Sequence, residues 1–111
     1  WKTSNEKYVQ NTIECEKLLP VKKFFRPPFG RIKRSQVSLL KEYEIVMWDV
    51  LTFDYDRSLN EEKCLRGSAA AIRSGSIVVF HDSIKAEKNL TYVLPRFMDH
   101  CTSKGFSFKS L

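Results

Sequence analysis

Short apolar segments alternate with longer amphipathic segments along this chain, and the alternation constrains the fold more than any other feature. Helical spacing of apolar residues is expected over 4–19, 35–43, 60–75 and 90–104. Strands are expected at 24–25, 45–49, 76–80 and 106–108. The run at 76–80 is continuous and β-branched, which is typical of a parallel strand covered on both faces. The sequence therefore predicts an α/β fold in which parallel strands alternate with helices.

Capping and breaking residues set the expected helix limits. Thr3 and Glu6 match a capping box at the start of the first helix, and Pro20 is expected to end it. Ser35 and Asn60 are expected to cap the second and third helices. Pro95 is expected to kink the fourth helix or to delay its start. A long connection is expected over 50–60.

The length and the charge distribution limit the class of protein. A chain of 111 residues holds at most one domain, and its longest apolar stretches have four residues, so no transmembrane helix is predicted. The net charge of +6 comes from residues 22–34, which hold six cations and no acid. Such a segment is compatible with a module that binds nucleic acid or an anionic surface, in which Phe24, Phe25 and Phe29 would stack on bases.

The three cysteines, Cys15, Cys64 and Cys101, are far apart and odd in number. This spacing fits neither a metal knuckle nor a complete disulfide framework. Each cysteine lies beside apolar residues in a segment with helical spacing, so buried free thiols are expected.

Polar residues follow three of the expected strands. They lie at 26–29, at 49–56 and at 81–83, and they include a guanidinium, several carboxylates and an imidazole. Ligands bind beyond the carboxyl ends of parallel strands, so these side chains are candidates for an acid and base site. From spacing alone, a catalytic His81 and a His81 that only makes local hydrogen bonds are both open.

Three motifs in order resemble the last three of five motifs of the polysaccharide deacetylase family, also called carbohydrate esterase family four. They are Phe25-Arg26-Pro27-Pro28-Phe29-Gly30, Trp48-Asp49-Val50-Leu51-Thr52-Phe53-Asp54-Tyr55 and Ile77-Val78-Val79-Phe80-His81-Asp82. The resemblance covers essentially the whole chain. It implies a metal-dependent hydrolase that removes N- or O-acetyl groups from a polysaccharide or oligosaccharide, built on a distorted (β/α) barrel.

The resemblance assigns roles to individual positions. Arg26 matches the arginine that pairs with the carboxylate of the catalytic base. Phe29 matches an aromatic residue whose backbone N–H helps to form the oxyanion hole. His81 matches the general acid that protonates the leaving amine, and Val79 stands where the family has a leucine that lines the pocket for the acetyl methyl group.

The fourth family motif is altered in this chain. Its Asp-x-x-Asp-Trp pattern reads Leu51 to Tyr55 here, so the first acid is leucine and the tryptophan is tyrosine. Asp54 remains, and a carboxylate there can orient His81 and favour its protonated form. Tyr55 offers an aromatic face for a sugar ring, and Trp48 is expected to contact the substrate as well.

The first two family motifs, which supply the base and the metal ligands, are missing. The resemblance implies a divalent metal, with zinc expected, yet the two histidines, His81 and His100, offer no ligand set, and His100 is expected to be structural or solvated. The expectation is therefore that residues 1–111 are part of a polysaccharide deacetylase-like domain, the C-terminal half of the barrel, with no metal ligands and no activity alone.

Two other functions stay open at this point. One is the basic binding module, although the phenylalanines of that segment also fit a strand and a proline turn, so no nucleic-acid partner is expected. The other is a carbohydrate-binding relative without catalysis. A half barrel would expose a strand edge and the apolar side chains of Phe24, Ile45 and Val78, which predicts self-association through that edge.

Overall fold

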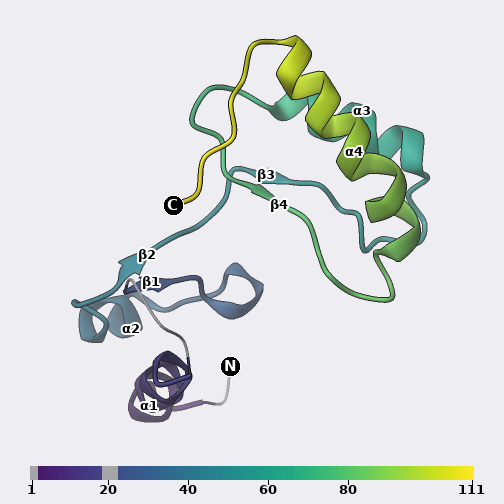
Figure 1. The fold of residues 1–111 in the computed structure, drawn as a ribbon. Coiled ribbons are helices and arrows are strands. Elements are labelled where there is room, and N and C mark those ends of the chain that lie inside the picture. Colours follow the sequence, from purple (N-terminus) through teal and green to yellow (C-terminus); the bar gives the residue numbers. More distant parts are fainter. Residues whose placement is uncertain (1–2, 19–22) are drawn as a thin grey trace. The chain divides into compact units, whose positions relative to one another are not determined.

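The structure is a computed structural model that describes residues 3–18 and 23–111 (Figure 1). The chain forms two compact units, Trp1–Met47 and Trp48–Leu111. Over the described residues, each unit contains two α-helices and a two-stranded parallel sheet. The predicted α/β class with parallel strands is therefore confirmed.

In the first unit, one α-helix precedes the first strand in the sequence and a second α-helix follows it. Its sheet pairs Phe24 with Glu44 and Phe25 with Ile45 in parallel. The rings of Tyr8, Phe25 and Tyr43 pack edge to face, with Phe25 between the two tyrosines. The elements are α1 (Asn5–Glu16), β1 (Phe24–Phe25), the 3₁₀ turn η1 (Pro28–Gly30), α2 (Arg34–Leu39) and β2 (Glu44–Ile45).

The second unit packs two helices against each other beside a parallel strand pair. Its sheet pairs Val50 with Val78 and Leu51 with Val79. The core cluster joins α3 and α4, and Phe80, which follows β4, packs edge to face on Phe97 of α4. The elements are β3 (Val50–Leu51), α3 (Glu61–Ala71), β4 (Val78–Val79) and α4 (Glu87–Ser103), and Cys64, Val93, Phe97 and Cys101 form a cluster of buried core residues.

The helix starts follow local hydrogen bonds, and two of them differ from the prediction. Ser4, not Thr3, caps α1 by accepting a hydrogen bond from the Lys7 amide. At α2 the N-cap is Lys33, whose amide donates to the Gln36 side chain, so the expected cap at Ser35 is wrong. The expected cap of α3 is confirmed, because the Asn60 side chain accepts from the Lys63 amide.

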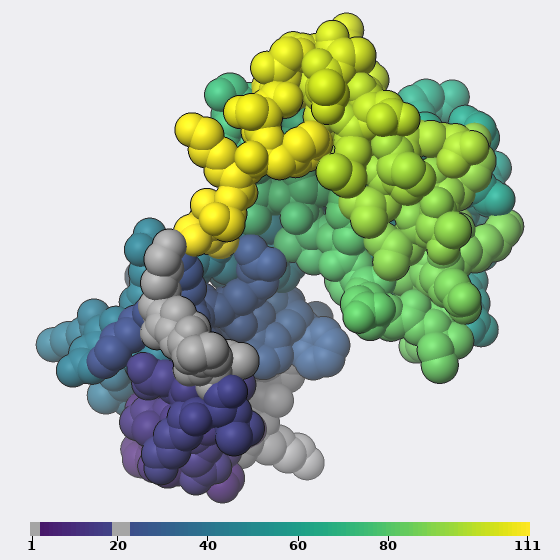
Figure 2. Space-filling view, in the orientation of Figure 1, coloured from purple at the N-terminus to yellow at the C-terminus, as the bar shows by residue number. Residues whose placement is uncertain are grey.

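The helix ends also depart from the expected limits. Helix α1 ends at Glu16, three residues early, and the expected stop at Pro20 lies outside the described residues. Helix α4 begins at Glu87, so Pro95 does not delay its start. Gly105 follows α4 with φ of 80°, as expected of a glycine that terminates a helix. In Figure 2, the yellow-green atoms of α4 lie on the surface of the second unit.

The strands are shorter than the apolar runs predict. The expected strand at 45–49 is observed only as Glu44–Ile45, and β3 falls in the segment expected to be a connection. The strand expected at 106–108 does not form within the part of the chain that the structure describes. Cys15 is exposed, so only Cys64 and Cys101 are the buried free thiols that the sequence predicts. Over residues 3–18 and 23–111, none of the helices is long and apolar enough to cross a membrane.

Candidate active site

His81 and Asp54 form a tight pair in the second unit. One carboxylate oxygen, Oδ1 of Asp54, lies 2.7 Å from Nδ1 of His81, and the other, Oδ2, accepts the main-chain N–H of His81 at 2.7 Å. The Asp54 side chain is 0% exposed, whereas the His81 side chain is 36% exposed. The buried carboxylate thus fixes both the backbone and the ring of a histidine that reaches solvent.

The strand pair places these two residues together. Asp54 follows β3 and His81 follows β4, so both lie at the carboxyl end of the parallel pair. Thr52 extends the pairing past the strand, because its amide and its hydroxyl both donate to the Val79 carbonyl, at 3.4 and 2.9 Å. The sequence prediction that residues after these strands meet is therefore confirmed for Asp54 and His81.

Aromatic side chains border the pair. The Tyr55 ring meets the His81 ring edge to face, with ring centroids 4.6 Å apart. The ring centroids of Phe53 and Tyr55 are 6.3 Å apart. Phe53 has φ of 57°, in the left-handed region that a non-glycine residue rarely adopts. This backbone conformation lies between buried Thr52 and buried Asp54, and both flanking side chains are held by hydrogen bonds to the segment around β4.

The other substrate candidates of this unit occupy different positions. Val79 is half-buried in β4, two residues before His81. Trp48 is half-buried and lies two residues before β3 begins, at the opposite end of the strand from Asp54. The structure therefore brings Tyr55 into contact with His81, while Trp48 precedes the strand.

Arg26 and Phe29 lie in the first unit, on the segment after β1. Nε of Arg26 donates to the Val46 carbonyl, just beyond β2, at 3.1 Å. Phe29 has φ of 56° and a side chain that is 92% exposed. The turn is held by Gly30 and Arg31, whose amides donate to Pro27 and Pro28. No acceptor among residues 3–18 and 23–111 bonds the Phe29 amide.

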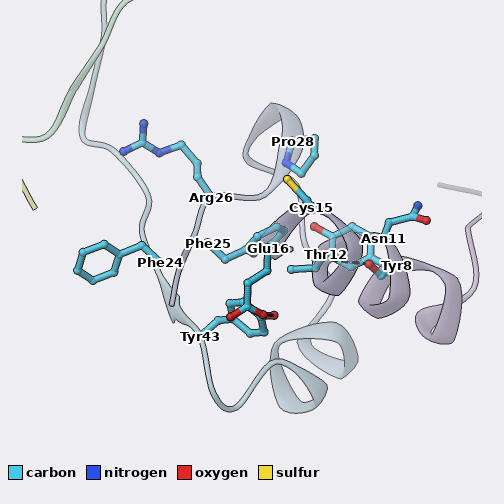
Figure 3. Close-up of a pocket in the computed structure, with 10 residues that line it drawn as sticks. All are labelled: Tyr8, Asn11, Thr12, Cys15, Glu16, Phe24, Phe25, Arg26, Pro28 and Tyr43. Atoms are coloured by element: carbon cyan, nitrogen blue, oxygen red, sulfur yellow. Dashed lines mark hydrogen bonds between the residues drawn. The ribbon is translucent and has the colours of Figure 1, made fainter. Parts of the chain in front are cut away.

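A hollow of about 430 Å³ lies between α1 and β1 in the same unit (Figure 3). Phe25 points into it toward Tyr43, while Arg26 points to the other side of β1. The Tyr8 hydroxyl is buried there and has no hydrogen-bond partner among the described residues. Burial raises the pKa of Tyr8. The Tyr43 hydroxyl, by contrast, donates to Glu16, which raises the pKa of Tyr43 to about 12.

The basic segment is partly engaged in local pairs. Lys23 forms an ion pair with Glu42 and lies 5.9 Å from the centre of the Tyr43 ring. This pairing raises the pKa of Lys23 and lowers that of Glu42. At least one cation of the segment is therefore balanced by an acid from outside it.

The described residues do not provide a metal site. Within 3–18 and 23–111, no three His, Cys, Asp or Glu side chains cluster in a way that could hold an ion. His100 is half-buried in the last turn of α4. The divalent metal implied by the sequence motifs thus has no fitting ligand set in the part of the chain that the structure describes.

Three residues support the site through contacts that the sequence alone does not predict. Buried Cys64 donates its thiol to the Thr52 carbonyl at 3.0 Å, and buried Asn89 donates to the Asp56 and Leu59 carbonyls at 3.4 and 3.1 Å. Burial, and then the charge of Asp54, raise the pKa of Cys64. Asp49, the third, bonds the residues before β4. The available sequence signal for Asn89 was its position four residues before Val93, which puts a polar side chain on the apolar face of a helix.

The fold is that of carbohydrate deacetylases. A peptidoglycan N-acetylglucosamine deacetylase, solved with 4-naphthalen-1-yl-N-oxidanyl-benzamide, matches 99% of this chain with a TM-score of 0.88 and 22% identity. A family 4 carbohydrate esterase from Streptomyces lividans, solved with acetate, matches 75% of this chain with a TM-score of 0.61 and 24% identity. No family model and no curated protein matches the chain.

The resemblance read from the three sequence motifs is confirmed by these two folds. The match covers 55% of the first solved chain and 42% of the second, so this chain spans about half the length of the structures it matches.

Proposed function

We propose that this chain supplies the proton-donating part of a hydrolase that removes N- or O-acetyl groups from a polysaccharide or oligosaccharide. The observation that carries the proposal is the double contact of buried Asp54 with the ring and the main chain of half-exposed His81. The two solved neighbours, a peptidoglycan N-acetylglucosamine deacetylase and a carbohydrate esterase that binds acetate, support this class of substrate.

His81 is the proposed general acid. A carboxylate that accepts from Nδ1 fixes the tautomer and the ring orientation, which leaves Nε2 to exchange a proton with the substrate. As the bond between the acetyl carbon and the sugar nitrogen or oxygen breaks, Nε2–H donates its proton to that leaving atom. Asp54 stays ionised in this step and acts by holding His81.

Phe29 is proposed to contribute its backbone N–H to an oxyanion hole. Such a donor must have no other acceptor and must be held rigidly, because it stabilises charge that appears only in the transition state. The turn hydrogen bonds of Gly30 and Arg31 on either side, and the Phe29 amide without an acceptor in the described chain, support this role. The proposal does not use the exposed ring, so a side-chain substitution at Phe29 would not test it.

The remaining assignments rest on the motif positions. Arg26 is proposed to orient the carboxylate of the catalytic base. Its guanidinium group is held by the hydrogen bond from Nε to the Val46 carbonyl. Tyr55, Val79 and Trp48 are proposed to contact the sugar or its acetyl group. Tyr55 has the most direct support, because its ring already contacts the acid.

The metal and the base are proposed to come from sequence beyond the described residues. A hydrolytic metal site needs about three protein ligands and an open position, and the described chain has no such group. The proposal is therefore that the 111 residues form the C-terminal half of a distorted (β/α) barrel and do not hydrolyse substrate alone.

The experiment compares His81→Ala with the unchanged full-length protein on an N-acetylglucosamine oligomer. Acetate release is measured over a range of pH, and His100→Ala serves as the matched control because His100 lies on α4 away from the strand ends. Loss of about 100-fold or more in kcat for His81→Ala alone is expected of a general acid. Wild-type turnover by His81→Ala would refute the assignment.

A further inference from the structure

The two strands that carry Asp54 and His81 are too short to fix their own alignment. Each has only two residues, Val50–Leu51 and Val78–Val79. Isolated two-stranded sheets are marginal, and a slip of one residue turns every side chain to the other face. Because His81 lies two residues after β4, such a slip would separate it from Asp54.

Asp49 makes a set of contacts across the start of this strand pair. Its Oδ1 accepts the Ile77 main-chain N–H at 2.8 Å, and its Oδ2 accepts the Ser76 hydroxyl at 2.9 Å. Its own amide donates to the Ile77 carbonyl at 3.2 Å. Asp49 therefore bonds the two residues that lead into β4 through both its side chain and its main chain.

The contacts of Asp49 repeat those of Asp54 at the other end of the pair. Asp54 accepts the main-chain N–H of His81, two residues beyond β4, and Asp49 accepts the Ile77 amide immediately before β4. The two aspartates lie on either side of β3 in the sequence. Together they hold β4 at both ends in the alignment that pairs Val50 with Val78.

We propose that Asp49 is a positioning residue that sets the register of β4 and so delivers His81 to Asp54. Asp49 lies at the amino ends of the strands, away from His81, and so acts through β4 rather than on a substrate. This inference rests on the proposed role of His81. The role of Asp49 is tested by the tautomer of the His81 ring, whereas the role of His81 is tested by turnover. Either proposal can therefore fail without the other.

Substitution of Arg73 can distinguish an effect of the Asp49 hydrogen bonds on strand register from an effect of the Asp49 ion pair. Its Nη2 lies 3.1 Å from Oδ2 of Asp49, but its side chain is 73% exposed. Exposed ion pairs contribute little because solvent screens them. Removing Arg73 should thus leave the hydrogen bonds of Asp49 with Ser76 and Ile77 in place.

The test measures the ring nitrogens of His81 by ¹⁵N NMR in the 111-residue chain. Wild type should show the Nδ1–H tautomer at a pH where the ring is neutral, because Asp54 accepts there, and a slowly exchanging His81 amide. Asp49→Ala should lose the Nδ1–H preference and speed exchange of the His81 amide. His100 is the internal reference, and the amides of Val93 and Phe97 report whether the core remains folded.

The control variants decide the outcome even if Asp49→Ala does not fold. Asp49→Asn keeps one acceptor for the Ile77 amide, and Ser76→Ala removes only the hydroxyl bond, so each should cause a partial loss of the Nδ1–H signal. Arg73→Ala should cause none. Unchanged His81 signals in folded Asp49→Ala, or in both partial variants, would overturn the proposal, as would an effect of Arg73→Ala equal to that of Asp49→Ala.

Discussion

Asp54 uses both carboxylate oxygens on a single neighbouring residue, one on the ring and one on the main chain of His81. An amide side chain has the same shape but only one acceptor oxygen. Replacement by asparagine therefore separates the geometry of the pair from its hydrogen bonding, which alanine cannot do because it also leaves a void.

Asp54→Asn should lower kcat for deacetylation by the full-length protein by about 100-fold or more, since the ring or the main chain of His81 loses its acceptor. The measurement is acetate release from an N-acetylglucosamine oligomer. His100→Ala is the control and should keep the wild-type kcat, because His100 lies in the last turn of α4 and has no role in the proposal. Wild-type kcat for Asp54→Asn would contradict a role for Asp54 in orienting the acid.

Tyr8 and Tyr43 form a matched pair for a stability test in the first unit. Tyr8→Phe removes a buried hydroxyl with no partner in the described chain, so it should raise the free energy of unfolding by up to about 1 kcal/mol. Tyr43→Phe removes the bond to Glu16 and should lower it by about 1 kcal/mol. Chemical denaturation measures the free energy of unfolding of both variants. Equal changes would contradict the claim that the Tyr43 hydroxyl is hydrogen-bonded while the Tyr8 hydroxyl has no partner in the described chain.

At the scale of elements, the sequence predicts the helices better than the strands. Asn60 caps α3 as expected, because a cap depends only on residues a few positions away. The sequence predicts one strand over 45–49, but only Ile45 of that range lies in β2, and the next strand begins at Val50. Pairing is decided by partners far along the chain, so the run alone could not place β3.

The candidate site likewise combines residues that a local sequence pattern indicates with contacts between distant residues that it does not. His81 and Asp54 were predicted because each is a chemically capable residue after an apolar run. The supporting contacts of Cys64, Asn89 and Asp49 join residues 12 to 33 positions apart, and no local pattern reports them.

The α3–α4 pair contains the two buried thiols, and their protection gives a test of this element. Iodoacetamide should label exposed Cys15 in the native chain and should reach Cys64 and Cys101 only after unfolding. Cys15→Ala should abolish native labelling. Mass spectrometry of digested protein locates the label, and rapid native labelling of Cys64 would contradict the packing of α3 on α4.

The same thiols predict how stability depends on pH. Burial raises the pKa of Cys64 and of Cys101 above the ordinary value of 9.0. The unfolded thiols ionise first, so the unfolded chain binds fewer protons and the free energy of unfolding should fall as pH rises past 9.0. The double variant Cys64→Ala with Cys101→Ala should lack this part of the decrease, which denaturation at several alkaline pH values would show.

At the scale of the whole molecule, residues 3–18 and 23–111 contain the proposed acid, and no cluster among them could hold the proposed metal. The 111-residue chain, dialysed against zinc and then against buffer, should retain no bound zinc by mass spectrometry, and a full-length protein should retain about one per chain. Retention of one zinc by the 111-residue chain would show ligands that the described residues do not contain.

The small parallel sheets predict association of the chain with itself. Parallel strands are normally covered on both faces, yet Phe24 in β1 is 38% exposed. Light scattering on the 111-residue chain should therefore give a mass above 13.0 kDa that rises with concentration. Phe24→Lys should shift it toward the monomer, and a monomer at all concentrations would contradict the open-edge proposal.

The thiol of Cys64 links α3 to the strand pair, since it donates to Thr52, whose hydroxyl donates in turn to Val79. The S–H stretching vibration absorbs in a part of the infrared spectrum that is otherwise almost free of protein bands, and hydrogen bonding lowers its frequency. Cys64 is thus an intrinsic vibrational label beside the carboxyl end of β3, and it would report without any added chromophore whether binding of a sugar disturbs that end.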